Sequence, residues 1–199
     1  MLKNRLRDIA VGLLACAAWL GVCTFLTSCA SLSTAEVNAA DIPSQSKIVA
    51  GVPFFAQDDY QCGPACLAGV LNFLGENTTP EAVAAKIFRE EARGATTLDM
   101  AVYPRTIGYD SRWYSGDIRD LCAAVDSGQP RIIFVDYGLG PVSAFHFMVV
   151  VGYSPEGAIV NSGGDEHKVV AWPSFMGPWE KTGHWTLEIA PKGHLSARR

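Results

Sequence analysis

The sequence predicts one α+β domain in which an N-terminal helical lobe packs on a C-terminal antiparallel sheet. Helix signals fill the first half of the chain, and β-branched and aromatic runs follow Pro130. The composition, 49% hydrophobic and 18% charged residues, is typical of a packed core. A length of 199 residues leaves room for one ordinary domain and a short appendage. We therefore expect one site, in the crevice between the two lobes.

The helices are recognised by apolar spacing and by their ends. Pro64 stands in the first turn of an apolar-periodic stretch that Gly75 ends. Thr79-Pro80-Glu81 is typical of a second helix start, and Pro104 shortens or kinks a third helix. We expect helices at 63–74, at 80–88, from 97 to about 104, and from 115–117 to Gly128.

The strands are runs of β-branched and aromatic residues separated by Gly, Pro, Ser and Asp. Consecutive runs with short connections indicate an antiparallel meander. We expect strands at 131–136, 145–153, 158–161, 167–170 and 184–189, after a short leading strand or extended arm at 48–55.

The N-terminus has the pattern of an export signal. Lys3, Arg5 and Arg7 precede a mostly apolar run, 9–26. The run ends in Leu26-Thr27-Ser28-Cys29, which resembles the lipobox of bacterial lipoproteins. This resemblance implies removal of residues 1–28 and a lipid on Cys29. The alternative is an uncleaved membrane anchor, since about 18 apolar residues just span a bilayer.

The rest of the chain divides by composition. Residues 29–47 are small and polar, and we expect them to be the lipidated cysteine and a flexible tether. Residues 48–191 are expected to form the domain, and residues 192–199 a polar tail. Ala30, which is not Asp, follows the cysteine, so the lipoprotein resemblance implies the outer membrane, facing the periplasm. Loss of residues 1–28, with three basic residues and one acidic residue, takes the formal net charge from −4 to −6. With no basic cluster beyond the signal, nucleic acid is not an expected partner.

Six cysteines bear on compartment and chemistry. Cys16 and Cys23 leave with the signal, and Cys29 is lipidated, so three remain outside the cytoplasm. Because three cysteines cannot all pair, one possible arrangement is a disulfide between Cys66 and Cys122 with Cys62 left as a thiol. The alternative is that all three are buried thiols.

Cys62 is the candidate nucleophile. It stands directly before a predicted helix, where unpaired N–H groups and the helix dipole favour a thiolate. Gly63 permits close backbone approach. Gln57, five residues earlier, is placed to donate an amide N–H to an oxyanion.

A thiolate nucleophile needs a base, and the sequence holds four histidines. His146 opens the most apolar predicted strand, where a neutral imidazole can take and return a proton. We expect Asn161, in the next strand, to orient the ring of His146. A tight hairpin would, however, place Asn161 about 10 Å from His146 along the strand ladder. Asp165 is the alternative orienting residue.

Three blocks together resemble a known family. They are Val52-Pro53-Phe54-Phe55-Ala56-Gln57, Gln61-Cys62-Gly63-Pro64-Ala65-Cys66-Leu67 and His146-Phe147-Met148-Val149-Val150-Val151-Gly152-Tyr153. They look like the bacteriocin-processing, double-glycine cysteine peptidases of the papain-like clan, over about Val52 to Pro191. The resemblance implies a papain-like fold with Cys62 as nucleophile, His146 as base, Gln57 in the oxyanion hole and Asn161 as orienting residue.

The chain departs from this family in two ways. The family has Asp followed by Pro at the third position, where this chain has Asn161-Ser162-Gly163. The sequence contains no spanning bundle and no phosphate-loop motif of the exporter-fused members, so we expect it to resemble the stand-alone, lipid-anchored relatives. Cleavage after a double-glycine leader is therefore not implied.

The expected reaction is hydrolysis of a peptide or protein in the cell envelope through a thioester on Cys62. No metal or cofactor is expected, since the histidines and cysteines lack zinc-type spacing. An acyltransferase or amidase would use the same residues. Three tryptophans near the C-terminus could line such a site, although sheet packing is their simpler role: Trp172, Trp179 and Trp185. A noncatalytic envelope adaptor is the third possibility.

Overall fold

A computed structural model describes residues 37–56 and 61–195. They belong to one compact unit, Thr34–Arg199, which is separate from Met1–Ser33. The predicted signal, Cys29 and Gln57 lie outside the described residues. Within the described ranges, no helix is both long and apolar enough to cross a membrane.

Four helices of the first half lie where the sequence predicts them: α2(Cys62–Phe73), α3(Pro80–Ile87), α4(Thr97–Thr106) and α5(Ile118–Asp126). The caps explain their starts. Thr79 accepts a hydrogen bond from the backbone of Ala82, and Asp117 forms a reciprocal capping box with Asp120. Helix α4 continues two residues past Pro104.

One antiparallel sheet forms the second lobe. The five strands expected after Pro130 are present, as β5(Arg131–Asp136), β6(Phe145–Tyr153), β7(Gly157–Ser162), β8(Asp165–Ala171) and β9(Trp185–Pro191). The strand order is β4-β9-β5-β6-β7-β8, and β1(Lys47–Ile48) pairs with β6 as well. Strand β6 is therefore central, because β5, β7 and β1 all bond to it. The leading strand is much shorter than the expected 48–55.

Strand β4(Tyr109–Ser115) was not expected, since the sequence predicts only helices between residue 63 and Pro130. It pairs along its length with β9. Its pattern is inverted relative to an ordinary half-buried strand, because Ser111 is buried whereas Trp113 is exposed. An alternation that places the polar residue inside gives no strand signal in a sequence.

Helix α6(Trp172–Glu180) was also not expected, because it contains Pro173, Gly177 and Pro178. Three aromatic side chains on one face hold it: Trp172, Phe175 and Trp179, each no more than 2% exposed. Together with Trp185 they pack in the core, so the tryptophans serve sheet packing. Burial outweighs the poor helix propensity of the segment.

Residues on the N-terminal side of the expected domain boundary at residue 48 also pack against the domain. A short 3-10 helix, η1(Ala39–Asp41), precedes β1, and Val37 and Ile42 pack against the core. Asp41 also pairs with Arg119 of α5 at 3.5 Å. Two apolar residues in an otherwise polar segment thus join residues 37–47 to the domain, where the sequence predicts a flexible tether.

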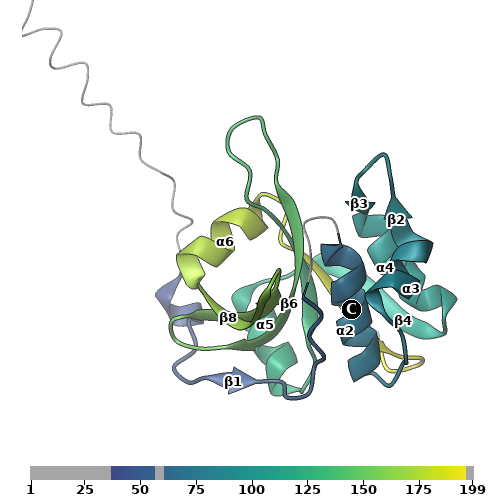
Figure 1. The fold of residues 1–199 in the computed structure, drawn as a ribbon. Coiled ribbons are helices and arrows are strands. Elements are labelled where there is room, and N and C mark those ends of the chain that lie inside the picture. Colours follow the sequence, from purple (N-terminus) through teal and green to yellow (C-terminus); the bar gives the residue numbers. More distant parts are fainter. Residues whose placement is uncertain (1–36, 57–60, 196–199) are drawn as a thin grey trace, which may run out of the picture. The chain divides into compact units, whose positions relative to one another are not determined.

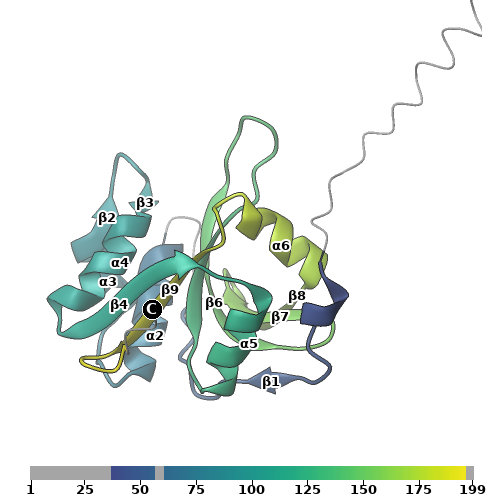
Figure 2. The same cartoon turned by 180° about the vertical axis from the view of Figure 1, so that it is seen from behind.

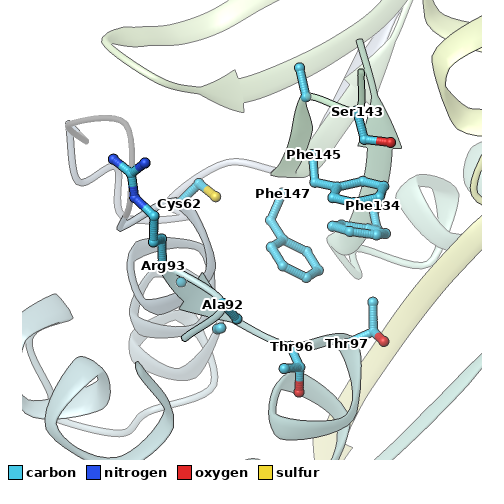
Figure 3. Close-up of a pocket in the computed structure, with 12 residues that line it drawn as sticks. Cys62, Ala92, Arg93, Thr96, Thr97, Phe134, Ser143, Phe145 and Phe147 are labelled. Carbon is cyan, nitrogen blue, oxygen red and sulfur yellow. The ribbon is translucent and has the colours of Figure 1, made fainter. Parts of the chain in front are cut away.

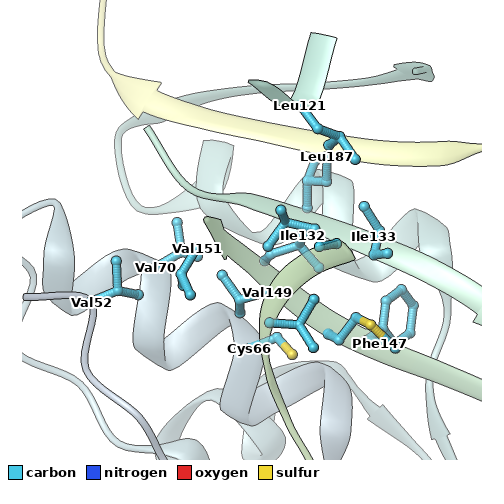
Figure 4. Packing of buried hydrophobic residues seen from close by; sticks show 14 of the residues in the cluster. Val52, Cys66, Val70, Leu121, Ile132, Ile133, Phe147, Val149, Val151 and Leu187 are labelled. Atoms are coloured by element: carbon cyan, nitrogen blue, oxygen red, sulfur yellow. The ribbon is translucent and has the colours of Figure 1, made fainter. Parts of the chain in front are cut away.

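The two lobes meet along β6. In Figures 1 and 2, α2, α3 and α4 lie on one side of β6, and α5 and α6 lie on the other. A small hairpin, β2(Phe88–Arg89) with β3(Gly94–Ala95), stands beside the helical lobe. Figure 4 shows the core between α2 and the sheet, where Cys66 and Val70 of α2 lie against Phe147, Val149 and Val151 of β6. This contact fixes the start of α2 beside the start of β6.

Candidate active site

Cys62 is the first residue of α2, as the sequence predicts, and its side chain is half-buried. Its N-cap residue, Gln61, makes no side-chain capping bond. The first N–H groups of the helix are therefore available to a negatively charged group at this position.

The protonation of Cys62 differs from the expectation. Burial raises the pKa of the Cys62 thiol, while hydrogen bonds from the backbone of Phe147, Gly63 and Cys62 itself lower it. The net direction is upward, because removing a thiolate from water costs more than these bonds return. The helix start is present, but it does not by itself give a thiolate.

His146 is the second residue of β6, and it is half-buried. Cys62 and the next residue of β6, Phe147, line the same cavity. The predicted nucleophile therefore lies beside the strand that carries the predicted base. The ring of Tyr137 lies beside the imidazole, with centroids 6.4 Å apart.

Ser162, and not Asn161, bonds to the imidazole. Nε2 of His146 is 2.9 Å from Oγ of Ser162. Asn161 lies opposite Val149, three residues along the ladder from His146, and its Oδ1 accepts a hydrogen bond from the backbone of His167 at 3.0 Å. The prediction of Asn161 as orienting residue is corrected in this respect.

Strand geometry gives the reason. Side chains alternate between the two faces of a sheet, so Asn161 shares the face of Val149. His146 lies three residues before Val149 in a regularly paired strand, so its side chain points to the opposite face. Ser162, the residue after Asn161, points to that same face. The parity of the β6–β7 register was the signal that could have identified Ser162 from the sequence.

The other predicted residues are placed as follows. Asp165 begins β8 on the surface, and its carboxylate accepts a hydrogen bond from Lys168 at 2.7 Å. The predicted oxyanion residue, Gln57, lies outside the described ranges. In the described part of the chain, no three His, Cys, Asp or Glu side chains gather as a metal-ligand set.

The expected Cys66–Cys122 disulfide is absent, and the alternative of three buried thiols holds only for Cys66, because Cys62 and Cys122 are half-buried. Cys66 is buried in α2 against β6, whereas Cys122 lies in α5 on the other side of that strand. Cys122 lines a separate hollow with residues 40–45. The two thiols belong to different helices that β6 separates.

Gly63 allows the close packing beside the thiol. A Cβ at this position would lie 2.9 Å from Cβ of Ala95 and 3.0 Å from Sδ of Met100. The hairpin β2–β3 and helix α4 can therefore approach the first turn of α2.

A cavity opens at the thiol. Its volume is about 530 Å³, and its walls come from both lobes. Figure 3 shows Cys62 with Arg93 on one side and Phe134, Phe145 and Phe147 on the other. The sequence predicts a crevice between the two lobes, but not the residues that line it, because they come from four separate segments.

A cysteine at a helix start, held beside a strand that carries a histidine, between a helical lobe and an antiparallel sheet, defines a papain-like cysteine peptidase. The chain belongs to the Peptidase_C39 like family, whose model matches residues 49–186. The predicted fold class and enzyme class are thereby confirmed.

Solved structures agree with this fold. A structure from Bacillus anthracis, described as a C39-like peptidase, superposes with a TM-score of 0.61 at 18% identity, covering 75% of this chain and 99% of that one. The peptidase domain of Streptococcus ComA, a bifunctional ABC transporter, gives a TM-score of 0.59 at 23% identity over 71% of this chain and 100% of that one.

A third structure is a double-glycine motif protease from an AMS/PCAT transporter, in complex with a leader peptide. It gives a TM-score of 0.53 at 21% identity over 75% of this chain and 99% of that one. No curated protein matches the chain.

Proposed function

We propose that this chain is a cell-envelope cysteine peptidase that hydrolyses a peptide bond through a thioester on Cys62. The observation that carries the proposal is that Cys62, at the start of α2, and Phe147, the residue after His146 in β6, line the same cavity. The family membership supports peptide hydrolysis. A similar fold in a leader-peptide complex supports a peptide as the substrate class.

In the first step, the thiol proton moves to His146 as Sγ of Cys62 forms a bond to the peptide carbonyl carbon. Nε2 is bonded to Ser162, so the nitrogen that exchanges this proton is Nδ1. Because the pKa of the thiol is raised, His146 acts as a general base during attack and does not hold a thiolate beforehand.

Collapse of the tetrahedral intermediate breaks the C–N bond, and His146 returns the proton to the leaving amine. Water, deprotonated by His146, then attacks the thioester and releases the acid and the thiol. Backbone N–H groups at the start of α2 face the developing oxyanion, with Gln57 as the second donor. Ser162 accepts from or donates to Nε2 and keeps the ring in place throughout.

The test is peptide hydrolysis by the purified chain. We expect Cys62→Ala to abolish turnover and to leave the thermal transition unchanged. Cys122→Ser is the matched control, since it removes the half-buried thiol of α5 and is expected to retain turnover. Full activity of Cys62→Ala would refute the proposal, and transfer of the acyl group to an added amine in place of water would assign the acyltransferase alternative.

We also propose that Cys29 carries the lipid that anchors the enzyme, in the outer membrane facing the periplasm. The residues Leu26-Thr27-Ser28-Cys29 support this proposal. Cells fed an alkynyl fatty acid should label the wild-type chain and leave Cys29→Ala unlabelled. An intact mass that still contains residues 1–28 would assign the uncleaved anchor.

A further inference from the structure

The cavity beside Cys62 has two unlike walls. Residues of β5, β6 and the loop between them form one wall, and the turn of the β2–β3 hairpin, β3 and the start of α4 form the other. Figure 3 shows the sulfur of Cys62 at its edge. A volume of about 530 Å³ lies within the range of sites that enclose small ligands, roughly 300–1,000 Å³.

The sheet wall is a cluster of three phenylalanines. Phe134 stacks on Phe145 with centroids 5.1 Å apart, and on Phe147 with centroids 4.5 Å apart. Trp185 supports the cluster edge-on from the core. Phe145 is nevertheless 60% exposed, so an aromatic face is presented to the space beside the thiol.

This wall is held in place before any ligand arrives. The carboxylate of Asp136 accepts hydrogen bonds from the backbone of Gly138 at 2.8 Å and of Ala144 at 2.7 Å. Lys181 donates to the carbonyl of Gly138 at 2.7 Å. These bonds close the base of the β5–β6 loop, which carries Ser143, Ala144 and Phe145 into the wall. A preformed wall spends little free energy on ordering.

The opposite wall is lined by small residues: Ala92, Gly94, Ala95, Thr96 and Thr97. In Figure 3, Ala92 and Thr96 do not reach across to the phenylalanines. Arg93 is the one charged residue among the described residues that line the cavity. The space is therefore apolar on the sheet side and empty of protein side chains.

We infer that this cavity binds a large apolar side chain, aromatic or branched aliphatic, that lies within two residues of the scissile bond. The inference rests on the proposed function, because it places that bond at Cys62. A substrate with only glycine near the scissile bond would leave the phenylalanine face in water. Burial of a leucine or phenylalanine side chain there is worth roughly a 10- to 100-fold preference over glycine.

The probes are internally quenched octapeptides of alanine and serine. In each, one of the four central positions carries Gly, Glu, Leu or Phe, and the cleaved bond is mapped by mass spectrometry. We expect kcat/KM for Leu and Phe to exceed that for Gly by at least about tenfold at one position. Equal or better cleavage of the Gly peptides would overturn the inference and leave the proposed function intact.

Two variants and one control connect the preference to the cavity. Phe145→Ala should lower the Phe-to-Gly ratio at that position close to one, and Phe145→Glu should reverse it in favour of Gly. Trp113→Ala is the matched control, because Trp113 is 59% exposed on β4 and does not line the cavity. An equal loss of the ratio in Trp113→Ala would refute the assignment.

A binding measurement decides the case in which no peptide is cleaved. That result would count against the proposed function alone. The same peptides, fluorescently labelled, are titrated with the Cys62→Ala chain and followed by anisotropy. Binding of Phe peptides at least about tenfold tighter than Gly peptides, lost in Cys62→Ala with Phe145→Ala, would support the inference, and equal binding would refute it.

Discussion

Nε2 of His146 and Oγ of Ser162, sixteen residues apart in the chain, lie 2.9 Å from each other. The bond fixes the ring through a neutral hydroxyl. A hydroxyl orients an imidazole but adds no charge to stabilise its protonated form. The site therefore places an oriented imidazole in β6 and, at the start of α2, a thiol whose pKa is raised by burial.

Removal of this hydroxyl should slow the chemistry. We expect Ser162→Ala to lower kcat about 10- to 100-fold, since a hydrogen bond to a group that becomes charged is worth about 1.5–3 kcal/mol. Ser162→Asp should raise the pKa of His146 and move the acid limb of the kcat–pH profile to higher pH. Asn161→Ala is the control: it removes the bond to His167 in the β7–β8 turn and should leave the profile in place. A loss in Asn161→Ala as large as that in Ser162→Ala would contradict the assignment.

Alkylation of Cys62 should follow a thiol that is hard to ionise. Burial raises the pKa of this thiol, so the rate of modification by iodoacetamide should titrate above the unperturbed value of about 8.5 in the absence of substrate. Peptide mapping distinguishes Cys62 from Cys122. The pKa of Cys122 is raised to about 11 by burial and by the nearby Asp126 and Asp117. Fast alkylation of Cys62 that persists to about pH 6 would indicate a preformed ion pair instead.

Alkaline pH should destabilise the fold. Burial and Asp126 raise the pKa of Cys122 to about 11, and burial with the hydrogen bond to Asp126 raises that of Tyr153 to about 12. In the unfolded chain these groups ionise near about 8.5 and about 10. The unfolded chain then binds fewer protons than the folded one, so the free energy of unfolding falls with rising pH.

For Cys122 the contribution is complete below about pH 8.5 and is lost as pH rises through about 11. Urea unfolding at several pH values measures this slope. Cys122→Ser should flatten it between about pH 9 and about pH 11, whereas a slope identical to wild type would show that Cys122 does not contribute.

Gly63→Ala should disturb both stability and catalysis. The new methyl group would meet Ala95 and Met100 at contacts shorter than ordinary packing allows, so we expect a loss of about 1–3 kcal/mol and a lower kcat. Gly177→Ala in α6 is the matched control, because a Cβ there meets nothing within 4 Å. Alanine has the higher helix propensity, so this control should gain up to about 1 kcal/mol. Equal behaviour of the two variants in urea unfolding would contradict the close approach at Gly63.

The parts of the fold that could be predicted are those with local signals. Helix α5 begins at a capping box, and β6 is an uninterrupted apolar run, so both were placed to within a few residues. Strand β4 and helix α6 could not be predicted, because partners distant in sequence stabilise them against their own pattern. Strand β9 pairs with β4, and the sheet buries the aromatic face of α6.

The same division holds for the site. Cys62 and His146 stand at the starts of recognisable elements, so their candidacy could be predicted from local sequence. The choice between Asn161 and Ser162 depends on which strand positions oppose each other, and a one-residue difference exchanges the two faces of a sheet. The crevice between the lobes was expected, but its lining could not be predicted, since Phe134 and Phe145 line it together with residues of the distant β2–β3 hairpin.

The central place of β6 has a consequence for motion. Its amides bond to neighbours on both sides, so the N–H groups of Met148 to Val150 should exchange with solvent deuterons only through global unfolding. The β2–β3 hairpin consists of two-residue strands and should exchange through brief local opening. The phenylalanine wall of the cavity is thus expected to be rigid, whereas the hairpin wall is expected to move. Substrates of different size would then be accommodated by movement of the hairpin, while the phenylalanines keep their positions.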